Sequence, residues 1–105
     1  MSECRLNAYH IMWLFVFFDL PVTTKRERKI ASDFRKDLLK DGFVMMQFSV
    51  YIRHCASYES LVVHKKRVKG VMPITGKVSM LAVTDKQYGE IETVFGKAAK
   101  KEIKA

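Results

Sequence analysis

The sequence predicts an α+β fold in which an antiparallel sheet carries two helices on one face. Strand-like hydrophobic patterns alternate with helical ones along the chain, in the order 12–18, 24–41, 43–54, 57–72 and 77–84. The chain has 105 residues, no internal repeat and no linker-like stretch. These observations together favour one domain built around one hydrophobic core.

The first strand and the first helix have the clearest patterns. Residues 12–18 form an unbroken apolar run rich in aromatics and valine, which predicts a strand covered on both faces. Thr24 to Glu27 match the S/T-x-x-E capping box, so a helix is expected to begin there. Gly42 is expected to end it in the left-handed conformation, after about 17 residues or about 25 Å. The apolar stripe of this helix is Ile30, Ala31, Phe34 and Leu38.

Between residues 43 and 54 the hydrophobic period changes to two, which predicts a strand, or two strands separated by a bend near Gln47. Its apolar side is expected to consist of Val44, Met46, Phe48, Val50 and Ile52. The opposite side is expected to include Gln47, Ser49, Tyr51 and Arg53.

A second helix and a further strand follow. Ser57 is expected to cap the helix, which ends near Gly70 and Pro73. Its apolar residues are Leu61, Val62, Val68 and Met72. The strand at 77–84 places Val78, Met80 and Ala82 opposite Ser79, Leu81 and Val83. A short last strand is predicted at 91–95.

This order of elements is that of a ferredoxin-like βαββαβ sandwich. We place it at about residues 9–95 of a single domain 1–105, between an N-terminal extension at 1–8 and a lysine-rich tail at 97–105. Helices on one face leave the other uncovered, yet the first strand is apolar on both sides. Because large apolar patches usually mark interfaces and two-fold assemblies are the commonest, we predict a homodimer packed sheet to sheet.

The amino-acid composition limits the classes of function that fit this chain. Nineteen Lys and Arg against eleven Asp and Glu give a net charge of +8, which favours a polyanionic partner such as nucleic acid. The apolar share of 49% is too high for a disordered chain. No run is long and apolar enough for a membrane span, and residues 1–10 lack a signal-peptide pattern. Cys4 and Cys55 are not spaced in a way that indicates a zinc site or a disulfide framework. We therefore expect no membrane association and a cytoplasmic location.

Asp19 is the candidate catalytic and metal-binding residue, because it follows the apolar run of the first strand. One interpretation is a carboxylate that hydrogen-bonds its own turn. The other is a Mg²⁺ ligand, but Mg²⁺ usually takes one or two carboxylates together with phosphates and water. No second acid lies nearby in sequence, so a two-fold axis would have to supply the Asp19 of a second copy.

Basic residues crowd the first helix. One interpretation is a solvated helix face. The other is a surface that binds phosphates at the helix N-terminus. Positive side chains at this end are unfavourable next to the positive end of the helix dipole, and bound phosphates would offset that cost. The residues that we predict to bind nucleic acid are Lys25, Arg26, Arg28, Lys29, Arg35, Lys36 and Arg53. A second basic cluster consists of Lys65, Lys66, Arg67 and Lys69. We interpret it as a solvated face unless it lines the same groove as the first.

Three segments resemble the small CRISPR-associated adaptation protein family, Cas2, in its type II-like form: "WLFVFFDLPVTTKRERK" (13–29), "GFVMMQFSVYIR" (42–53) and "VTDKQYGEIE" (83–92). The resemblance covers about residues 9–95. Matching positions are Asp19, Arg26, Arg28, Ser49 and Tyr51, the last two as supporting residues. The extension at 1–8 and the tail after Gly96 depart from the family pattern.

The resemblance implies a ferredoxin-like homodimer whose last strand extends the partner's sheet. It implies a spacer-acquisition subunit that holds duplex DNA between two integrase dimers, and also a Mg²⁺-dependent endonuclease with Asp19 as the metal ligand in each copy. We expect the DNA-binding role first. The alternative is cleavage of RNA, including single-stranded RNA, or of DNA at paired Asp19 sites, although the sequence offers no evident general base. A third alternative, a regulatory domain that binds a small molecule, agrees least with the net charge of +8.

Overall fold

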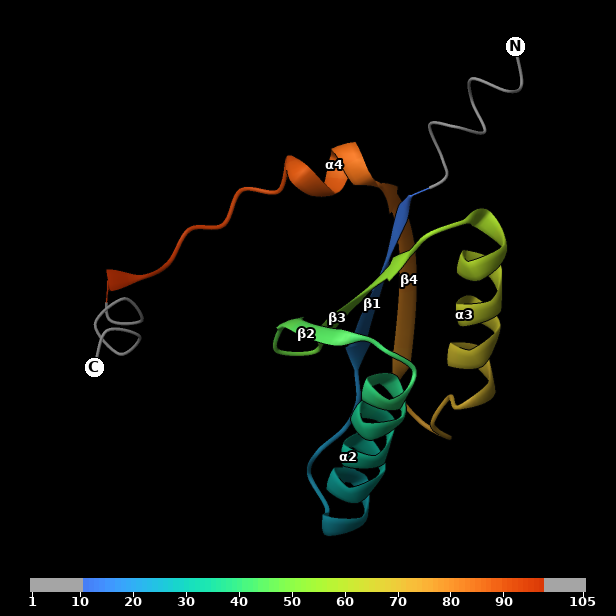
Figure 1. Ribbon diagram of the computed structural model, residues 1–105. Coiled ribbons are helices and arrows are strands. Elements are labelled where there is room, and N and C mark those ends of the chain that lie inside the picture. Colours follow the sequence, from blue (N-terminus) through green and yellow to red (C-terminus); the bar gives the residue numbers. More distant parts are fainter. Residues whose placement is uncertain (1–10, 98–105) are drawn as a thin grey trace.

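A computed structural model describes residues 11–97 as a four-stranded antiparallel sheet with helices packed against it (Figure 1). The elements are β1 (Met12–Asp19), α2 (Lys25–Lys40), β2 (Val44–Gln47), β3 (Val50–Cys55), α3 (Tyr58–Gly70), β4 (Lys77–Thr84) and α4 (Asp85–Gly89). The strand order is β2-β3-β1-β4. The predicted α+β, ferredoxin-like fold is confirmed. The predicted extension at 1–8, and the predicted tail beyond its first residue, lie outside the described residues.

β1 is a central strand with a neighbour on each side. It pairs with β4 from Met12 to Asp19 and with β3 from Met12 to Phe17, both antiparallel. Leu14 and Val16 have no exposed surface at all. The apolar run predicted to be a buried strand is therefore the middle of the sheet, where both edges of the backbone are hydrogen-bonded.

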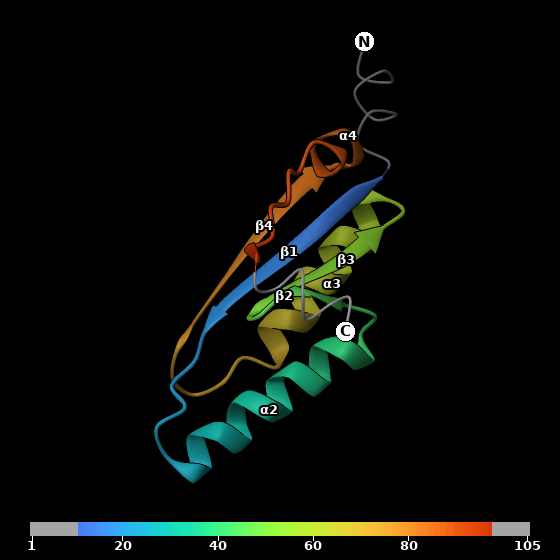
Figure 2. The ribbon, with the colours of Figure 1, turned by 90° about the vertical axis from the view of Figure 1, so that its left-hand side faces the viewer.

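The main core lies between one face of the sheet and the helices. Leu14, Val16 and Phe18 of β1 pack in one cluster with residues of both long helices, Phe34 and Leu38 of α2 and Leu61 and Val68 of α3. In Figure 2, which views the sheet from its other side, α3 lies behind it. Full burial of each of these side chains stabilises the fold by about 1.5–3 kcal/mol. The expectation of two helices on one face is confirmed.

The predicted start and end of α2 are both confirmed. The Thr24 hydroxyl accepts a hydrogen bond from the backbone of Glu27 at 3.0 Å, and the Glu27 carboxylate accepts one from the backbone of Thr24 at 3.0 Å. Gly42 has φ +91°, a left-handed conformation that glycine adopts without strain. The backbone N–H of Phe43 then bonds to the carbonyl of Leu38 at 3.0 Å, which closes the helix.

The segment 43–54 is a hairpin, so the bend expected near Gln47 is confirmed. The single apolar side that we predicted through it is wrong at Phe48. Phe48 and Ser49 form the turn, where Ser49 has φ +64° and Phe48 is 83% exposed. Tyr51, which we placed on the opposite side, is instead buried in the core cluster. Reversal of the chain at the turn is what breaks the period of two.

The second helix begins as predicted, since the Ser57 hydroxyl accepts a hydrogen bond from the backbone of Ser60 at 3.1 Å. Its predicted apolar stripe is partly wrong, because Val62 and Met72 are exposed. The buried residues of α3 are Leu61, His64 and Val68. A histidine thus occupies the position between the two buried aliphatic residues of this helix.

β4 has the predicted bounds and the predicted alternation, and the structure shows that Val78, Met80 and Ala82 are the residues that pack against the core. The predicted strand at 91–95 is wrong within the described chain. A second capping box, formed by Thr84 and Gln87, begins α4 directly after β4. Residues 91–96 then run away from the sheet without regular structure (Figure 1), with Val94 and Phe95 exposed.

The face of the sheet opposite the helices, hereafter the open face, is only partly covered. Trp13 stacks on Tyr88 of α4 with ring centroids 3.9 Å apart, and its indole N–H donates to Asp85 at 2.8 Å. The two exposed apolar side chains Phe17 and Leu81 lie further along this face. The chain therefore covers one end of the open face by itself and leaves the other end exposed. No helix among residues 11–97 is long and apolar enough to cross a membrane.

Candidate nucleic-acid interface and metal-binding carboxylate

Asp19 lies at the end of β1 on the open face. Strand alternation places it on the same side as Phe15 and Phe17, and it is paired with Lys77 of β4. Its side chain is exposed. Among the hydrogen bonds of residues 11–97, none reaches the Asp19 carboxylate, so the interpretation as a turn-bonding residue gains no support.

The backbone around Asp19 is held by the turn before β4. Gly76 has φ +96°, and a Cβ atom there would lie 3.0 Å from the carbonyl oxygen of Asp19 and 2.6 Å from a methyl carbon of Leu20. Only glycine fits this close approach without displacing the end of β1. The strand end that carries the carboxylate is therefore fixed by packing, while the carboxylate itself is free to meet a ligand.

One chain offers Mg²⁺ a single ligand at this position. Within residues 11–97, no three side chains of His, Cys, Asp or Glu gather closely enough to hold a metal ion. Mg²⁺ retains several waters and binds through one or two carboxylates, often together with substrate phosphates. Asp19 fits such a site only if a nucleic-acid phosphate, a second copy of the chain, or both, complete it.

The predicted basic residues of α2 are mostly exposed. Lys25, Arg26, Arg28 and Lys29 are exposed in its first two turns, Lys36 is exposed further along, and Arg35 is half-buried. Helical spacing places Lys25, Lys29 and Lys36 on the outer side, opposite the buried Phe34 and Leu38. These side chains can meet a polyanion without disturbing the core.

Two of these cations already have partners. The Arg28 guanidinium donates to the carbonyls of Thr23 at 3.1 Å and Val22 at 3.3 Å, which ties it to the loop after β1. Lys29 forms an exposed ion pair with Asp33 at 3.3 Å. Exposed pairs of this kind contribute at most about 1 kcal/mol, so Lys29 can exchange its partner for a phosphate at small cost.

Arg26 borders a shallow groove of about 270 Å³ between the start of α2 and the turn before β4. The groove is lined by Thr24, Arg26, Glu27, Ile30, Ile74 and Thr75. Because Glu27 is bound to the capping backbone, Arg26 is the cation that this groove presents. The start of α2 and the turn that holds Asp19 thus lie side by side.

The remaining predicted residues have structural contacts. Arg53 donates through Nε to the carbonyl of Asp41 at 2.8 Å and through Nη1 to the carbonyl of His54 at 2.6 Å, which leaves fewer N–H groups for a phosphate. The Ser49 carbonyl accepts from the backbone of Phe18 at 3.1 Å in the hairpin turn. Tyr51 packs on Phe18 in the core, with ring centroids 5.5 Å apart. Ser49 and Tyr51 thus support the strand that leads to Asp19.

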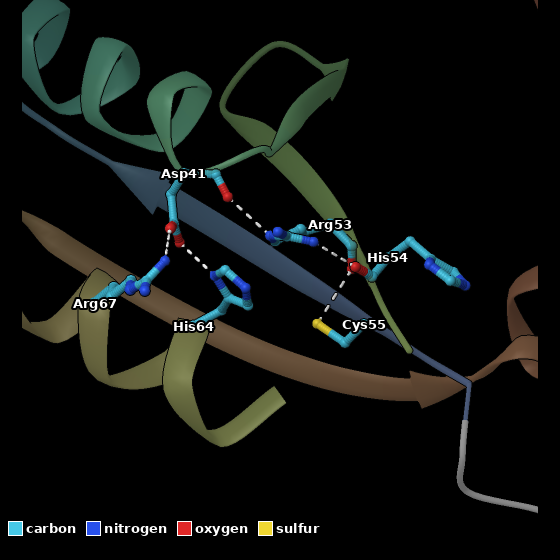
Figure 3. A network of polar contacts seen from close by, with 6 residues as sticks. All are labelled: Asp41, Arg53, His54, Cys55, His64 and Arg67. Atoms are coloured by element: carbon cyan, nitrogen blue, oxygen red, sulfur yellow. Dashed lines mark hydrogen bonds and ion pairs between the residues drawn. The ribbon is translucent and has the colours of Figure 1, made fainter. Parts of the chain in front are cut away.

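The structure also contains a polar cluster that sequence reasoning missed (Figure 3). Asp41, the C-cap of α2, accepts hydrogen bonds from His64 Nδ1 at 2.7 Å and from Arg67 Nη1 at 2.8 Å, both from α3. A carboxylate only accepts, so His64 Nδ1 carries the proton in this contact. The Asp41 side chain is 14% exposed and that of His64 is 7% exposed. This cluster lies beside a groove of about 350 Å³ between the C-terminal ends of α2 and α3.

The surroundings of Asp41 change its ionisation. Burial alone would raise the pKa of Asp41, but the hydrogen bonds from His64 and Arg67 and the positive charge of Arg67 outweigh it, so the pKa lies below its ordinary value of 3.8. Nearby, burial raises the pKa of the Cys55 thiol, whose Sγ lies 3.8 Å from the Arg53 carbonyl. A signal for the cluster was present in the sequence, since His64 falls on the apolar stripe between Leu61 and Val68.

Comparison with known proteins identifies the family. Residues 12–91 match the family model described as CRISPR associated protein Cas2. Proteins named CRISPR-associated endoribonuclease Cas2 are similar to most of the chain. One from Flavobacterium psychrophilum is 56% identical over 93 residues, which are 89% of this chain and 81% of that protein. One from Parvibaculum lavamentivorans is 54% identical over 82% of this chain and 85% of its own. One from Paracidovorax avenae is 44% identical over 95% of this chain and 93% of its own.

Asp41 is expected to make stability depend on pH in the acid range. Because its pKa is lower in the folded chain, its stabilisation is fully present above pH 3.8 and is lost as pH falls through the lower folded value. Asp41→Asn should lower the free energy of unfolding at neutral pH by about 1–3 kcal/mol, as for hydrogen bonds to charged groups. Urea unfolding of both proteins from neutral pH down to about pH 2 measures this difference, which should shrink in acid.

Asp37→Asn is the matched control, because Asp37 lines the same groove one turn earlier on α2. It should leave the free energy of unfolding nearly unchanged at every pH. An Asp41→Asn effect that is equally large in acid and at neutral pH would contradict the role of the carboxylate charge.

Proposed function

Since this chain belongs to the CRISPR-associated Cas2 family, we propose that it acts in CRISPR adaptation as a homodimer that holds duplex DNA by its backbone and bridges two dimers of the integrase subunit during spacer integration. The observation that carries the proposal is the separation of two surfaces. The exposed cations of α2 lie on its outer side, whereas the exposed apolar residues Phe17 and Leu81 lie on the open face.

The open face supports the homodimer. Leu81 is 52% exposed and Val44 is 56% exposed, and pairing through Phe15 and Ile52 places both on this face. The segment after α4 adds two more exposed apolar residues, Val94 and Phe95. Apolar surface of this extent is unusual for a monomer and favours a second copy, which offers the same patch across a two-fold axis.

Leu81→Glu should weaken this dimer, because it places a buried charge at the centre of the interface in each copy. Sedimentation velocity at micromolar concentration should show the wild type as a dimer and the variant shifted toward the monomer. Ser79→Glu, two residues away on the same strand and the same side, tests how far the interface extends toward Asp19. A monomeric wild type at that concentration would overturn the proposed assembly.

The α2 surface supports binding to the nucleic-acid backbone. Lysine and arginine neutralise phosphates and release condensed counterions, whatever the base sequence, and the net charge of +8 attracts the polyanion from a distance. Arg26 is the strongest candidate on this surface, since its groove joins the start of α2 to the turn beside Asp19.

Binding should therefore depend steeply on salt. The logarithm of the association constant should fall by about 0.9 per phosphate contact for each tenfold rise in salt, and Arg26→Gln should reduce this slope by about 0.9 for duplexes of any sequence. Fluorescence anisotropy with two unrelated labelled duplexes over a salt series measures both effects. A wild-type slope near zero would contradict backbone binding.

The names of the relatives favour a second candidate function, cleavage of nucleic acid, because the similar curated proteins are called endoribonucleases. Asp19 is the residue that would hold Mg²⁺, which when bound polarises a phosphodiester and lowers the pKa of a bound water. Asp19 itself would orient the ion at the end of β1, and Lys77, its neighbour in β4, would attract the phosphate. Where the Asp19 of a second copy completes the site, cleavage also depends on the proposed dimer.

Asp19→Asn should abolish Mg²⁺-dependent cleavage of RNA and of DNA, because the amide removes the ligand charge while it keeps the shape. The variant should remain a dimer, and its affinity for duplex DNA in EDTA should match that of the wild type within about twofold, since one exposed charge is changed. Spacer insertion in cells, measured in parallel, separates the two functions. Cleavage that persists in the variant would assign the activity to another group.

A further inference from the structure

The two basic helices are connected through one carboxylate. Within the part of the chain that the structure describes, the side-chain hydrogen bonds between the α2 segment and α3 all end at Asp41. The groove of about 350 Å³ separates the helix ends around this contact. Figure 3 shows Asp41 pointing toward α3, with His64 and Arg67 pointing back toward it. The relative position of α2 and α3 at this end therefore depends on Asp41.

The polar contacts around Asp41 compensate negative charge that gathers at the two helix ends. A helix C-terminus carries roughly half a negative charge, and here α2 and α3 bring their C-terminal ends together. The Asp41 carboxylate adds a full negative charge at the same place. His64 and Arg67 supply the compensating hydrogen bonds, and Arg53 binds the Asp41 carbonyl from β3. Without the carboxylate, His64 would remain buried with no charged partner, and the two helix ends would be joined by apolar packing alone among residues 11–97.

We propose that Asp41 is a positioning residue for nucleic-acid binding: by holding α3 against the end of α2 through His64 and Arg67, it sets the basic side chains of α3 at a fixed distance from those of α2, so that one duplex contacts both. The lysines of α3 in the same turns as His64 and Arg67 are Lys65, which is half-buried, and Lys66 and Lys69, which are exposed. On the sequence alone these lysines are a solvated face. Their attachment to α2 is what makes them part of one surface. This inference rests on the proposed DNA-binding function.

The sign of the effect tests it. Asp41→Asn raises the formal net charge by one from +8, so charge alone predicts tighter binding to DNA. Positioning predicts the opposite, because the part of α3 around His64 and Arg67 is no longer held to the end of α2 and its phosphate contacts are weakened. Asp41→Asn should therefore bind a labelled duplex several-fold more weakly than the wild type at physiological salt. Its salt slope should be smaller by about 0.9 for each phosphate contact that is lost.

Asp37→Asn is again the matched control, since it makes the same charge change on the same groove without touching α3 in any hydrogen bond of residues 11–97. It should bind as tightly as the wild type or slightly more tightly. Weaker binding by Asp41→Asn together with unchanged or tighter binding by Asp37→Asn supports the inference. Equal or tighter binding by both variants, with an unchanged slope, overturns it and leaves the proposed DNA binding intact.

A second variant keeps the test decisive if Asp41→Asn folds poorly. His64→Gln leaves the formal charge unchanged, and residue 64 is only 6% exposed, so it cannot touch the duplex directly. His64→Gln should lower both the affinity for the duplex and the salt slope, as Asp41→Asn should. Circular dichroism confirms that each variant is folded at the temperature of the measurement. Lack of binding by the wild type would overturn both the proposed function and this inference, whereas normal binding by folded His64→Gln overturns the inference alone.

Discussion

The structure depends on a strand that is apolar on both sides. β1 alternates Leu14, Val16 and Phe18 toward the helices with Phe15 and Phe17 toward the open face. Two helices can cover only the first side, because both follow strands of the same sheet and pack against the same core. The chain then uses α4 and Tyr88 to cover Trp13 at one end of the second side. The exposed remainder is the surface at which we propose that a second copy packs.

Polar side chains also stabilise the place where the C-terminal ends of α2 and α3 meet. Antiparallel packing along the whole length of two helices would pair each C-terminus with an N-terminus. Here the helices are offset and meet at their C-terminal ends, where the partial charges have the same sign. A buried carboxylate would worsen the repulsion if it stood alone. With His64 and Arg67 donating to both of its oxygens, Asp41 instead becomes the site at which the positive groups are held.

Local sequence signals predicted much of the fold and less of the site. The capping box at Thr24, the left-handed Gly42 and the alternation of β4 depend on neighbouring residues, and all were predicted. The bend near Gln47 was also predicted, but the exposure of Phe48 in the turn was not, because the alternation was extended through the point where the chain reverses. Asp41 lies 23 residues before His64 and 26 before Arg67, and only the packing of α3 brings it to them. Asp19 was predicted as the end of a strand, but its neighbours depend on assembly.

The type of recognition follows from how the aromatic residues are used. Trp13 stacks on Tyr88, and Phe18 packs against Phe34 and Tyr51, so these rings are occupied within the chain and are not free to stack on bases. The exposed rings Phe17, Phe48 and Phe95 lie outside α2, which carries the basic residues. In the proposed function, the exposed lysine and arginine side chains of α2 bind phosphates without distinguishing sequences. A surface of this kind suits a protein that must hold DNA of any sequence, provided that its charges keep a fixed spacing. In the proposed DNA-binding role, the contacts of Asp41 with His64 and Arg67 would hold the charges of α2 and α3 at such a spacing.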